Sequence, residues 1–196
     1  MRSPSWVLAL AAAIVAAGCA TQQAEMQAAP SPRVKFGKPI SNADIAAWDI
    51  DIRTTDGKGL PAGSGSVAEG KVVYEAKCLS CHGADGKGGP VFGTMVGGIG
   101  SFKTTTRVLT PGSMYPYAPI LFDYIRRAMP MDHPQSLTTN EVYAVSAYLL
   151  NLNGIIPDNA IMDQNTLARV QMPNRNGFIV DDRPDTKAVR CMTNCK

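Results

Sequence analysis

Hydrophobic and small residues recur at helical spacing in three stretches of the middle of the chain. The first stretch covers residues 67–77, where Ser66 and Glu69 have the spacing of a capping box at a helix start. The face expected to point inward consists of Val67, Gly70, Tyr74 and Lys77. This pattern predicts a helix that ends at Cys78.

The longest helical pattern covers residues 139–152. Thr138 and Glu141 repeat the capping-box spacing, and Gly154 is well placed to end the helix. Its apolar face carries Val142, Val145, Leu149 and Leu152. We therefore predict a second helix that is strongly apolar on one side.

Gly70 suggests that these two helices cross. Glycine is costly inside a helix unless another backbone approaches closely at that position. We expect Gly70 to face Tyr148, because an aromatic ring can fill the space that a glycine leaves. The alternatives are a simple weak point at Gly70 and a Tyr148 that merely borders the core.

The third helix is expected to begin near Pro119, since proline is favoured in the first turn. Its apolar face consists of Leu121, Phe122, Ile125 and Ala128. Asp123 and Arg127 have the spacing of an i,i+4 ion pair on the other side. The helix runs directly into Met129 and Pro130, and Pro130 prevents it from continuing.

The start of the chain has the pattern of an export signal. Arg2 precedes a short apolar run over residues 6–17, which is too short for an ordinary membrane span. Residues 16–19 resemble a lipoprotein signal, in which Cys19 becomes the lipidated first residue; plain cleavage near Ala20 is the alternative. We expect residues 1–20 to be removed and the mature chain to leave the cytoplasm.

Composition and charge argue against a nucleic-acid partner and against a second membrane span. Hydrophobic residues make up 45% of the chain, as in an ordinary soluble domain, and no second apolar run is long enough to span a bilayer. The formal net charge is only +3, and Arg2 in the export signal supplies one of these charges. Nucleic acid is therefore not an expected partner.

The cysteine motif carries the most specific chemistry in the sequence. Residues 78–82 read Cys-Leu-Ser-Cys-His, the pattern of covalent haem attachment. Two thiols at this spacing can add to the two vinyl groups of one porphyrin, which places the neighbouring His82 beside the iron. Cys78 and Cys81 are thus expected to hold one haem c, with His82 as an iron ligand.

Two other interpretations of the motif are weaker. A zinc site needs a second pair of ligands, and His133 is the only other histidine in the chain. A thioredoxin-like redox pair needs βαβ surroundings, for which the sequence gives no pattern. Cys191 and Cys195 lie near the C-terminus, and we expect them to form a disulfide with each other in an exported protein.

The stretch from Gly83 to Pro116 is glycine-rich and has no sustained period, so it is expected to be a long loop. A loop of this length is unusual in a compact domain unless it wraps a ligand. Pro90 has a plausible role in it: its carbonyl would accept a hydrogen bond from His82 and fix the imidazole tautomer. The alternative is an ordinary turn proline.

Together these features resemble class I cytochrome c. The resemblance covers roughly residues 66–154 and rests on the haem motif, the loop with Pro90, the Met129-Pro130 pair and the last helix. It implies a mainly α fold with three or more helices around one haem, with extended N- and C-terminal arms.

The resemblance also implies the sixth iron ligand. Family members carry the ligand methionine in a Met-Pro pair, which points to Met129. Met131 and His133 lie in the same short loop and remain alternatives, and His133 would give a bis-imidazole site of lower potential. We also expect Met131 to lie on the apolar rim where a partner docks.

A narrower resemblance reaches into both arms. Segments 45–51, 122–130, 153–156 and 172–178 are similar to the cytochrome subunits of bacterial sulfite and sulfane dehydrogenases. Such subunits accept electrons from a molybdenum-cofactor subunit and pass them on to the respiratory chain through a downstream cytochrome or oxidase. The sulfane type can carry a second haem domain, whereas this chain has one attachment motif.

The expected organisation has four parts. Residues 1–20 are the signal, 21–65 a tether and N-terminal arm, 66–154 the cytochrome domain and 155–196 a C-terminal arm. The arm is expected to wrap on the core or on a partner, with a disordered tail as the alternative. The protein is expected in the periplasm, with a membrane tether if Cys19 carries lipid.

Two functions are consistent with this sequence. An electron-transfer protein has both axial positions of the iron filled, here by His82 and Met129. A haem enzyme, such as a peroxidase or a thiosulfate-oxidising cytochrome, needs an open or thiolate-ligated position and polar groups beside it. The Met-Pro pair at the helix end favours electron transfer, without catalysis by this chain.

Overall fold

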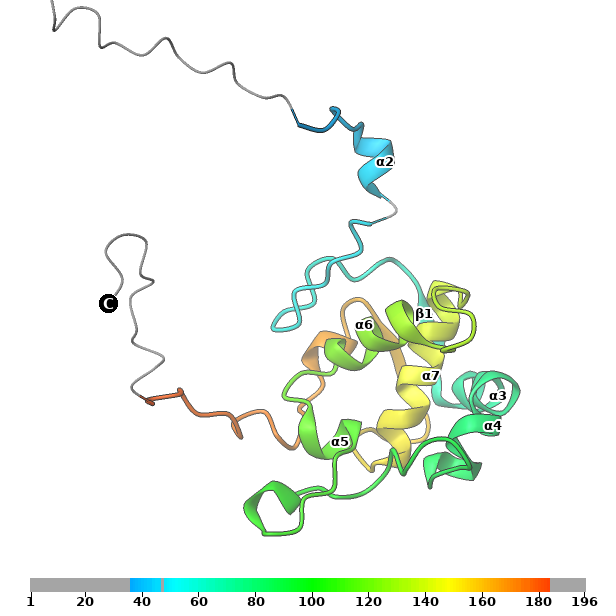
Figure 1. Cartoon of the computed structure of the whole chain (residues 1–196). Helices are drawn as coiled ribbons and strands as arrows, with labels where there is room; N and C mark the ends of the chain where they lie inside the picture. The colour runs from blue at the N-terminus through cyan, green and yellow to red at the C-terminus, as the bar shows by residue number, and fades with distance from the viewer. Residues whose placement is uncertain (1–35, 47, 184–196) are drawn as a thin grey trace, which may run out of the picture. The chain divides into compact units, whose positions relative to one another are not determined.

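The computed structural model describes residues 36–46 and 48–183, which divide into two units at residue 46 (Figure 1). The first unit contains the short helix α2 (Asn42–Ala46). Ser41 and Asp44 exchange hydrogen bonds at its start. The second unit contains the other helices and strands of the described residues, together with the Cys78–His82 motif.

Helices α3 (Val67–Lys77) and α7 (Thr139–Leu152) form the centre of the second unit. Both begin at the predicted capping boxes, with Ser66 accepting from the Glu69 amide and Thr138 from the Glu141 amide. Helix α7 ends at Asn153, and Gly154 follows in the left-handed conformation at φ 68°. The apolar face predicted for α7 is too narrow, because every residue from 142 to 150 is buried.

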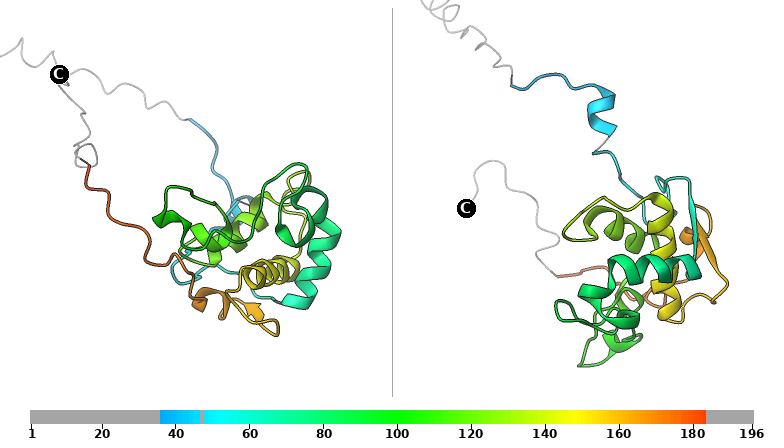
Figure 2. Two further views of the ribbon diagram at one scale, coloured as in Figure 1. Left: turned by 90° about the horizontal axis from the view of Figure 1, so that it is seen from below. Right: turned by 90° about the vertical axis from the view of Figure 1, so that its right-hand side faces the viewer.

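The predicted crossing of these helices is confirmed, and Figure 2 shows α3 passing across α7. A Cβ atom added at Gly70 would overlap the backbone carbonyl of Ala144 and lie 2.8 Å from Tyr148 Cβ. Next to the crossing, the rings of Tyr74 and Tyr148 lie 5.4 Å apart between centroids. A side chain at position 70 would therefore force the two backbones apart.

Helix α6 (Pro119–Ala128) packs on α7 through the buried side chains of Leu121, Phe122 and Ile125. The predicted pair between Asp123 and Arg127 is present at 2.9 Å. Arg127 also donates to the Ile50 carbonyl and to Asp51, which ties the chain before the core to this helix.

The glycine-rich stretch is less irregular than predicted. It contains the single-turn helix α5 (Pro111–Met114) and two 3-10 turns, Ala84–Gly86 and Ser101–Lys103. Thr110 and Ser113 form a capping box around α5. A four-residue helix is too short to produce a hydrophobic period, so the sequence pattern could not reveal it.

The chain after α7 packs on the core as far as Arg175. Strand β2 (Ile161–Asp163) pairs antiparallel with β1 (Ser64–Ser66), with Gly65 opposite Met162. The 3-10 turn Leu167–Arg169 follows, and the buried residues of this segment are Met162, Leu167, Val170 and Met172. Neither three-residue strand was predicted from the sequence. The predicted export signal and the Cys191–Cys195 disulfide lie outside the described residues.

Candidate haem site

One cavity of about 500 Å³ collects four of the five predicted site residues: Cys78, Cys81, His82 and Met129. Its volume lies in the range of ligand pockets. Two groups of lining residues are distinguished below. The attachment wall comprises the lining residues from Tyr74 to Met95, and the methionine wall those from Ile125 to Leu137. Val145 and Leu149 of α7 complete the lining.

The attachment wall is built where α3 ends and the short helix α4 (Leu79–His82) begins. The amides of Cys81 and His82 both donate to the Cys78 carbonyl, so the motif forms one compact turn. Both thiols are partly buried, and burial raises the pKa of the Cys78 thiol to about 11. Cys78 is therefore a protonated thiol at neutral pH rather than a ready metal ligand.

His82 is half-buried on this wall, and burial lowers the pKa of its imidazole. The neutral ring, which has a free lone pair for a metal, is therefore favoured. Its Nδ1 atom is buried and has no hydrogen-bond partner among the described residues. The bond predicted from His82 to the Pro90 carbonyl is thus not formed here. Pro90 is exposed, and its role stays a prediction.

The main chain around His82 is held by other contacts. The Tyr74 hydroxyl donates to the Gly83 carbonyl at 2.7 Å, and the Gly88 amide donates to the His82 carbonyl at 3.1 Å. The Phe92 ring stacks on the imidazole, with 5.0 Å between ring centroids and 22° between the planes. The sequence placed Tyr74 on a helix face but gave no signal for Phe92, which comes from the irregular loop.

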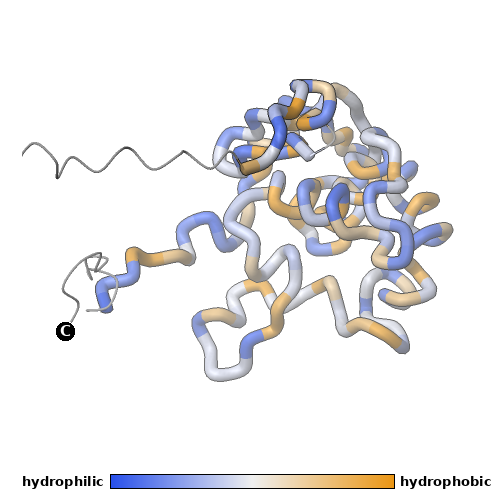
Figure 3. Tube along the Cα trace, turned by 45° about the horizontal axis from the view of Figure 1, so that its top comes forward, coloured by the Kyte–Doolittle hydropathy of each residue, from blue (hydrophilic) through white to orange (hydrophobic). Residues whose placement is uncertain are grey.

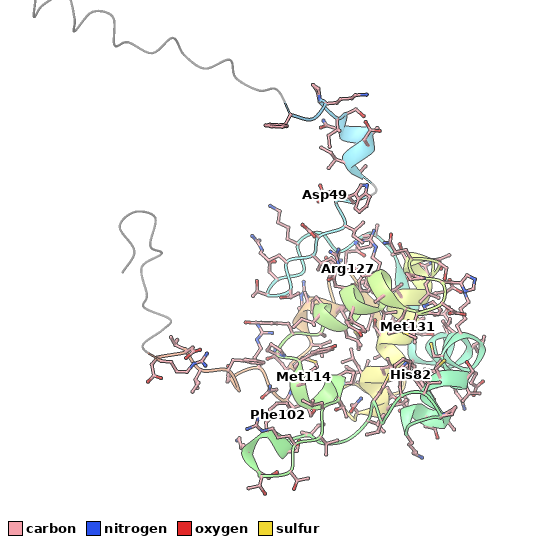
Figure 4. The ribbon with its side chains drawn as sticks, in the orientation of Figure 1. Asp49, His82, Phe102, Met114, Arg127 and Met131 are labelled. Atoms are coloured by element: carbon pink, nitrogen blue, oxygen red, sulfur yellow. The ribbon has the colours of Figure 1, made fainter. Side chains whose placement is uncertain are left out.

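The methionine wall starts at the end of α6. Met129 caps the helix through its amide, which donates to the Ile125 carbonyl at 3.0 Å, and its side chain packs against the core. Met131 is 62% exposed, and His133 is also exposed and lies 3.2 Å from Asp132. All three candidate ligands line the cavity, and Figure 4 shows Met131 on the same flank of the molecule as His82.

These residues fit a covalently bound haem better than a metal ion alone. The lining is mostly apolar, with Phe92, Ile125, Val145 and Leu149 among its members. Two thiols and the imidazole of His82 lie on one wall, where they would hold a covalently attached haem. Among the described residues there is no group of three side chains arranged to hold a metal such as zinc.

Comparison with known proteins agrees with this geometry. Residues 67–153 match the family model of cytochrome c. The chain is also similar to a chain in the crystal structure of the sulfane dehydrogenase SoxCD from Paracoccus pantotrophus. The sequences are 35% identical, the match covers 84% of this chain and 83% of that one, and the TM-score is 0.71.

This chain belongs to the class I cytochrome c family. The comparison with curated proteins gave no match. In the part of the cytochrome that the structure describes, no helix is long and apolar enough to cross a membrane. The family carries covalent haem c, and the spacing of Cys78 and Cys81 in this cytochrome is the one such attachment needs.

The protein's own groups determine how such a haem would be held. When bound, the haem supplies a one-electron iron couple, which gives the cytochrome its role in electron transfer. The two thiols would hold it covalently, and His82 would offer a neutral imidazole. Gly88 donates to the His82 carbonyl, and Tyr74 donates to the carbonyl of the next residue, Gly83. An apolar lining of this kind would influence the reduction potential of a bound haem.

Proposed function

We propose that this chain is a periplasmic cytochrome with one haem that serves as the electron-transfer subunit of a molybdenum-dependent sulfite or sulfane dehydrogenase. One observation carries this proposal. A cavity that holds Cys78, Cys81, His82 and Met129 together occurs in a chain 35% identical to one in sulfane dehydrogenase SoxCD. Electrons would enter from the molybdenum-cofactor subunit and leave to a downstream cytochrome or oxidase.

Met129 is the proposed sixth ligand of the iron. It is partly buried and packed against the core at the end of a rigid helix, which suits a ligand that must keep a fixed distance. Met131 and His133 are exposed, and His133 lies beside Asp132. The packing of the protein would fix the position of a largely solvent-exposed ligand less firmly. Filled axial positions favour electron transfer over catalysis at the iron.

We place electron exchange at the mouth of the cavity, with Met131 on its rim. An exposed apolar side chain beside the cavity suits a brief contact with a redox partner. Such a contact should be small, below roughly 1,200 Å² of total buried surface, because weak redox encounters fall at this end of the size range.

The proposal also includes export to the periplasm and the state of the mature N-terminus. Residues 1–20 would direct the chain to the periplasm, where the haem is attached and the Cys191–Cys195 disulfide can persist. Lipidation of Cys19 would tether the protein to the membrane, whereas plain cleavage would release it. Mass spectrometry of the mature N-terminus distinguishes these two forms.

Optical spectra of the purified protein, with and without carbon monoxide, test the electron-transfer role. Two filled axial positions predict spectra that carbon monoxide leaves unchanged in the reduced state, with a weak sulfur-to-iron band in the oxidised state. Rapid carbon monoxide binding would instead indicate an open position and a haem enzyme. Reduction of the haem by sulfite or a sulfane substrate in the presence of the molybdenum subunit would identify the substrate.

A further inference from the structure

The C-terminal arm is fixed to the core up to Arg175 and then leaves it. Met172 is buried, and the Asn174 side chain donates to the Met114 carbonyl at 2.9 Å. The Arg175 guanidinium lies 4.4 Å from the centroid of the Tyr117 ring. A turn closed by the Gly177 amide and the Asn174 carbonyl ends this anchored part. The direction in which the following residues depart is therefore set by the core.

The three residues after this turn are apolar and exposed. Phe178 is 65% exposed, Ile179 92% and Val180 89%. They have no regular secondary structure and make no backbone hydrogen bond to another described residue. Figure 3 shows the corresponding hydrophobic stretch on the departing arm, with hydrophilic residues on either side. A run of exposed apolar residues with free backbone groups is costly in water unless a partner covers it.

We infer that residues 178–180 are a docking strand for the molybdenum-cofactor subunit, which they join by adding to an exposed sheet edge. Strand addition uses backbone groups for affinity and alternate side chains for specificity, and this segment offers both. The inference rests on the proposed function, since it names the attachment surface for the same partner.

The similarity to the SoxCD chain supports this choice of partner. The match leaves about a sixth of this chain uncovered, whereas the residues after 153 make up more than a fifth of it. Part of the C-terminal arm is therefore shared with that chain. A match that extends beyond the haem domain into the arm favours the same kind of partner for this chain.

The docking strand lies away from the site of electron exchange. Residues 178–183 leave the second unit on the side opposite helices α3 and α4 (Figure 1), whereas those helices carry most of the attachment wall. If the arm holds the partner for a long time, the cavity rim at Met131 remains free for brief contacts with a redox centre. The two contacts can then differ in lifetime within one assembly.

Chromatography of periplasmic extracts tests the docking strand. Full-length variants replace the wild-type protein in the source organism, and each size-exclusion fraction is measured for haem absorbance and molybdenum content. Ile179→Asp places a charge on the docking strand, and Ile179→Pro keeps an apolar residue but removes the backbone donor. Val72→Asp, at an exposed apolar position on α3, is the matched control.

The wild type and Val72→Asp should elute with haem and molybdenum together. Both Ile179 variants should lose at least tenfold in co-eluting molybdenum while keeping the haem spectrum and thermal midpoint. Retention of molybdenum by Ile179→Asp overturns the docking strand and leaves the proposed function standing. Retention by Ile179→Pro alone overturns strand addition. A wild-type haem fraction without molybdenum overturns the proposed partner and the strand with it.

Discussion

His82 lies on a wall whose backbone is held by neighbouring elements, whereas Met129 lies at the start of an exposed loop. Tyr74 and Gly88 hold the peptide groups around His82, and Phe92 stacks on its ring. Met129 is held by the last turn of α6, and residues 131–136, Met131 among them, are exposed. The attachment wall therefore depends on the helix pair behind it, and the methionine wall on where one helix ends.

The helix crossing behind the attachment wall is the most sensitive point in the fold. Gly70→Val would place side-chain atoms on the Ala144 carbonyl, and rigid backbone cannot yield. We expect a loss of about 3 kcal/mol or more in the free energy of unfolding, measured by denaturant titration of the haem protein. Gly93→Ala is the control, because nothing lies within 4 Å of its added Cβ. Equal stability of the two variants would contradict the crossing.

Within the methionine wall, Met129 should have the largest effect on the spectrum and reduction potential of the haem. Met129→Ala should abolish the sulfur-to-iron band of the oxidised protein, whereas Met131→Ala and His133→Ala should keep it. The reduction potential of Met129→Ala should fall on the order of 100 mV, because axial ligands dominate haem potentials. Voltammetry and optical spectra measure both changes. Loss of the band in Met131→Ala alone would move the ligand to the exposed loop.

Tyr74 connects the helix pair to the peptide that follows His82. Tyr74→Phe removes the hydrogen bond to Gly83 and should cost about 1 kcal/mol of unfolding free energy at neutral pH. Burial raises the pKa of Tyr74 to about 12, so its contribution is complete below pH 10 and is lost between pH 10 and 12.

Between pH 10 and 12, Tyr74→Phe should therefore lose stability less steeply than the wild type, as measured by thermal unfolding. The pKa of Tyr143 is also raised to about 12 by burial, so part of the slope will remain. Burial also raises the pKa of Tyr148, so the control is Tyr124→Phe, at an exposed tyrosine on α6. An unchanged slope in Tyr74→Phe would exclude this contribution.

The exposed loop should affect the rate of electron transfer with the partner without affecting the haem. Met131→Lys should slow electron transfer roughly three- to tenfold and make the rate more dependent on salt, because a charge enters an apolar contact. Stopped-flow kinetics with the redox partner measure this effect, and the haem spectrum should not change. Leu109→Lys, at another exposed apolar position, should have the wild-type rate. If Met131→Lys also transfers electrons at the wild-type rate, the partner docks elsewhere.

The smallest effect is expected from the ion pair between α3 and α7. Lys77 and Glu141 lie 2.7 Å apart on a partly exposed surface, where such pairs contribute at most about 1 kcal/mol. Glu141→Gln can keep the helix cap and removes the charge. The Lys77 ammonium lowers the pKa of Glu141, so the pair stabilises the fold above pH 4.5 and is lost in acid.

Urea unfolding should thus separate Glu141→Gln from the wild type at pH 7 in low salt. The difference should vanish in high salt and as the wild-type carboxylate becomes protonated in acid. A difference that persists under both conditions would mean that the substitution disturbs the cap rather than the ion pair.

Local chemistry explains which features were predictable from sequence. Both capping boxes and the Asp123–Arg127 pair are set by spacing within one helix, and all are present. The crossing was predictable because a glycine inside a helix is costly unless another backbone approaches it closely. The haem motif is equally local. Phe92 and the strand pair β1–β2 depend on where distant segments meet, which no short period records. The partner of the His82 Nδ1 atom likewise depends on how the irregular loop folds over the ring, so the role of Pro90 stays a prediction.

Asn153 gives the glycine-rich loop an unusual evolutionary freedom. Its buried side chain donates to the carbonyls of Met95 and Leu149 and accepts from the Gly97 amide, so it holds the loop entirely through main-chain atoms. Main-chain groups are the same whatever residue carries them. Substitutions in the exposed part of the loop can therefore accumulate without releasing it from α7, whereas Asn153 itself has no equivalent replacement. The exposed surface of the loop can therefore change while its attachment to α7 stays the same.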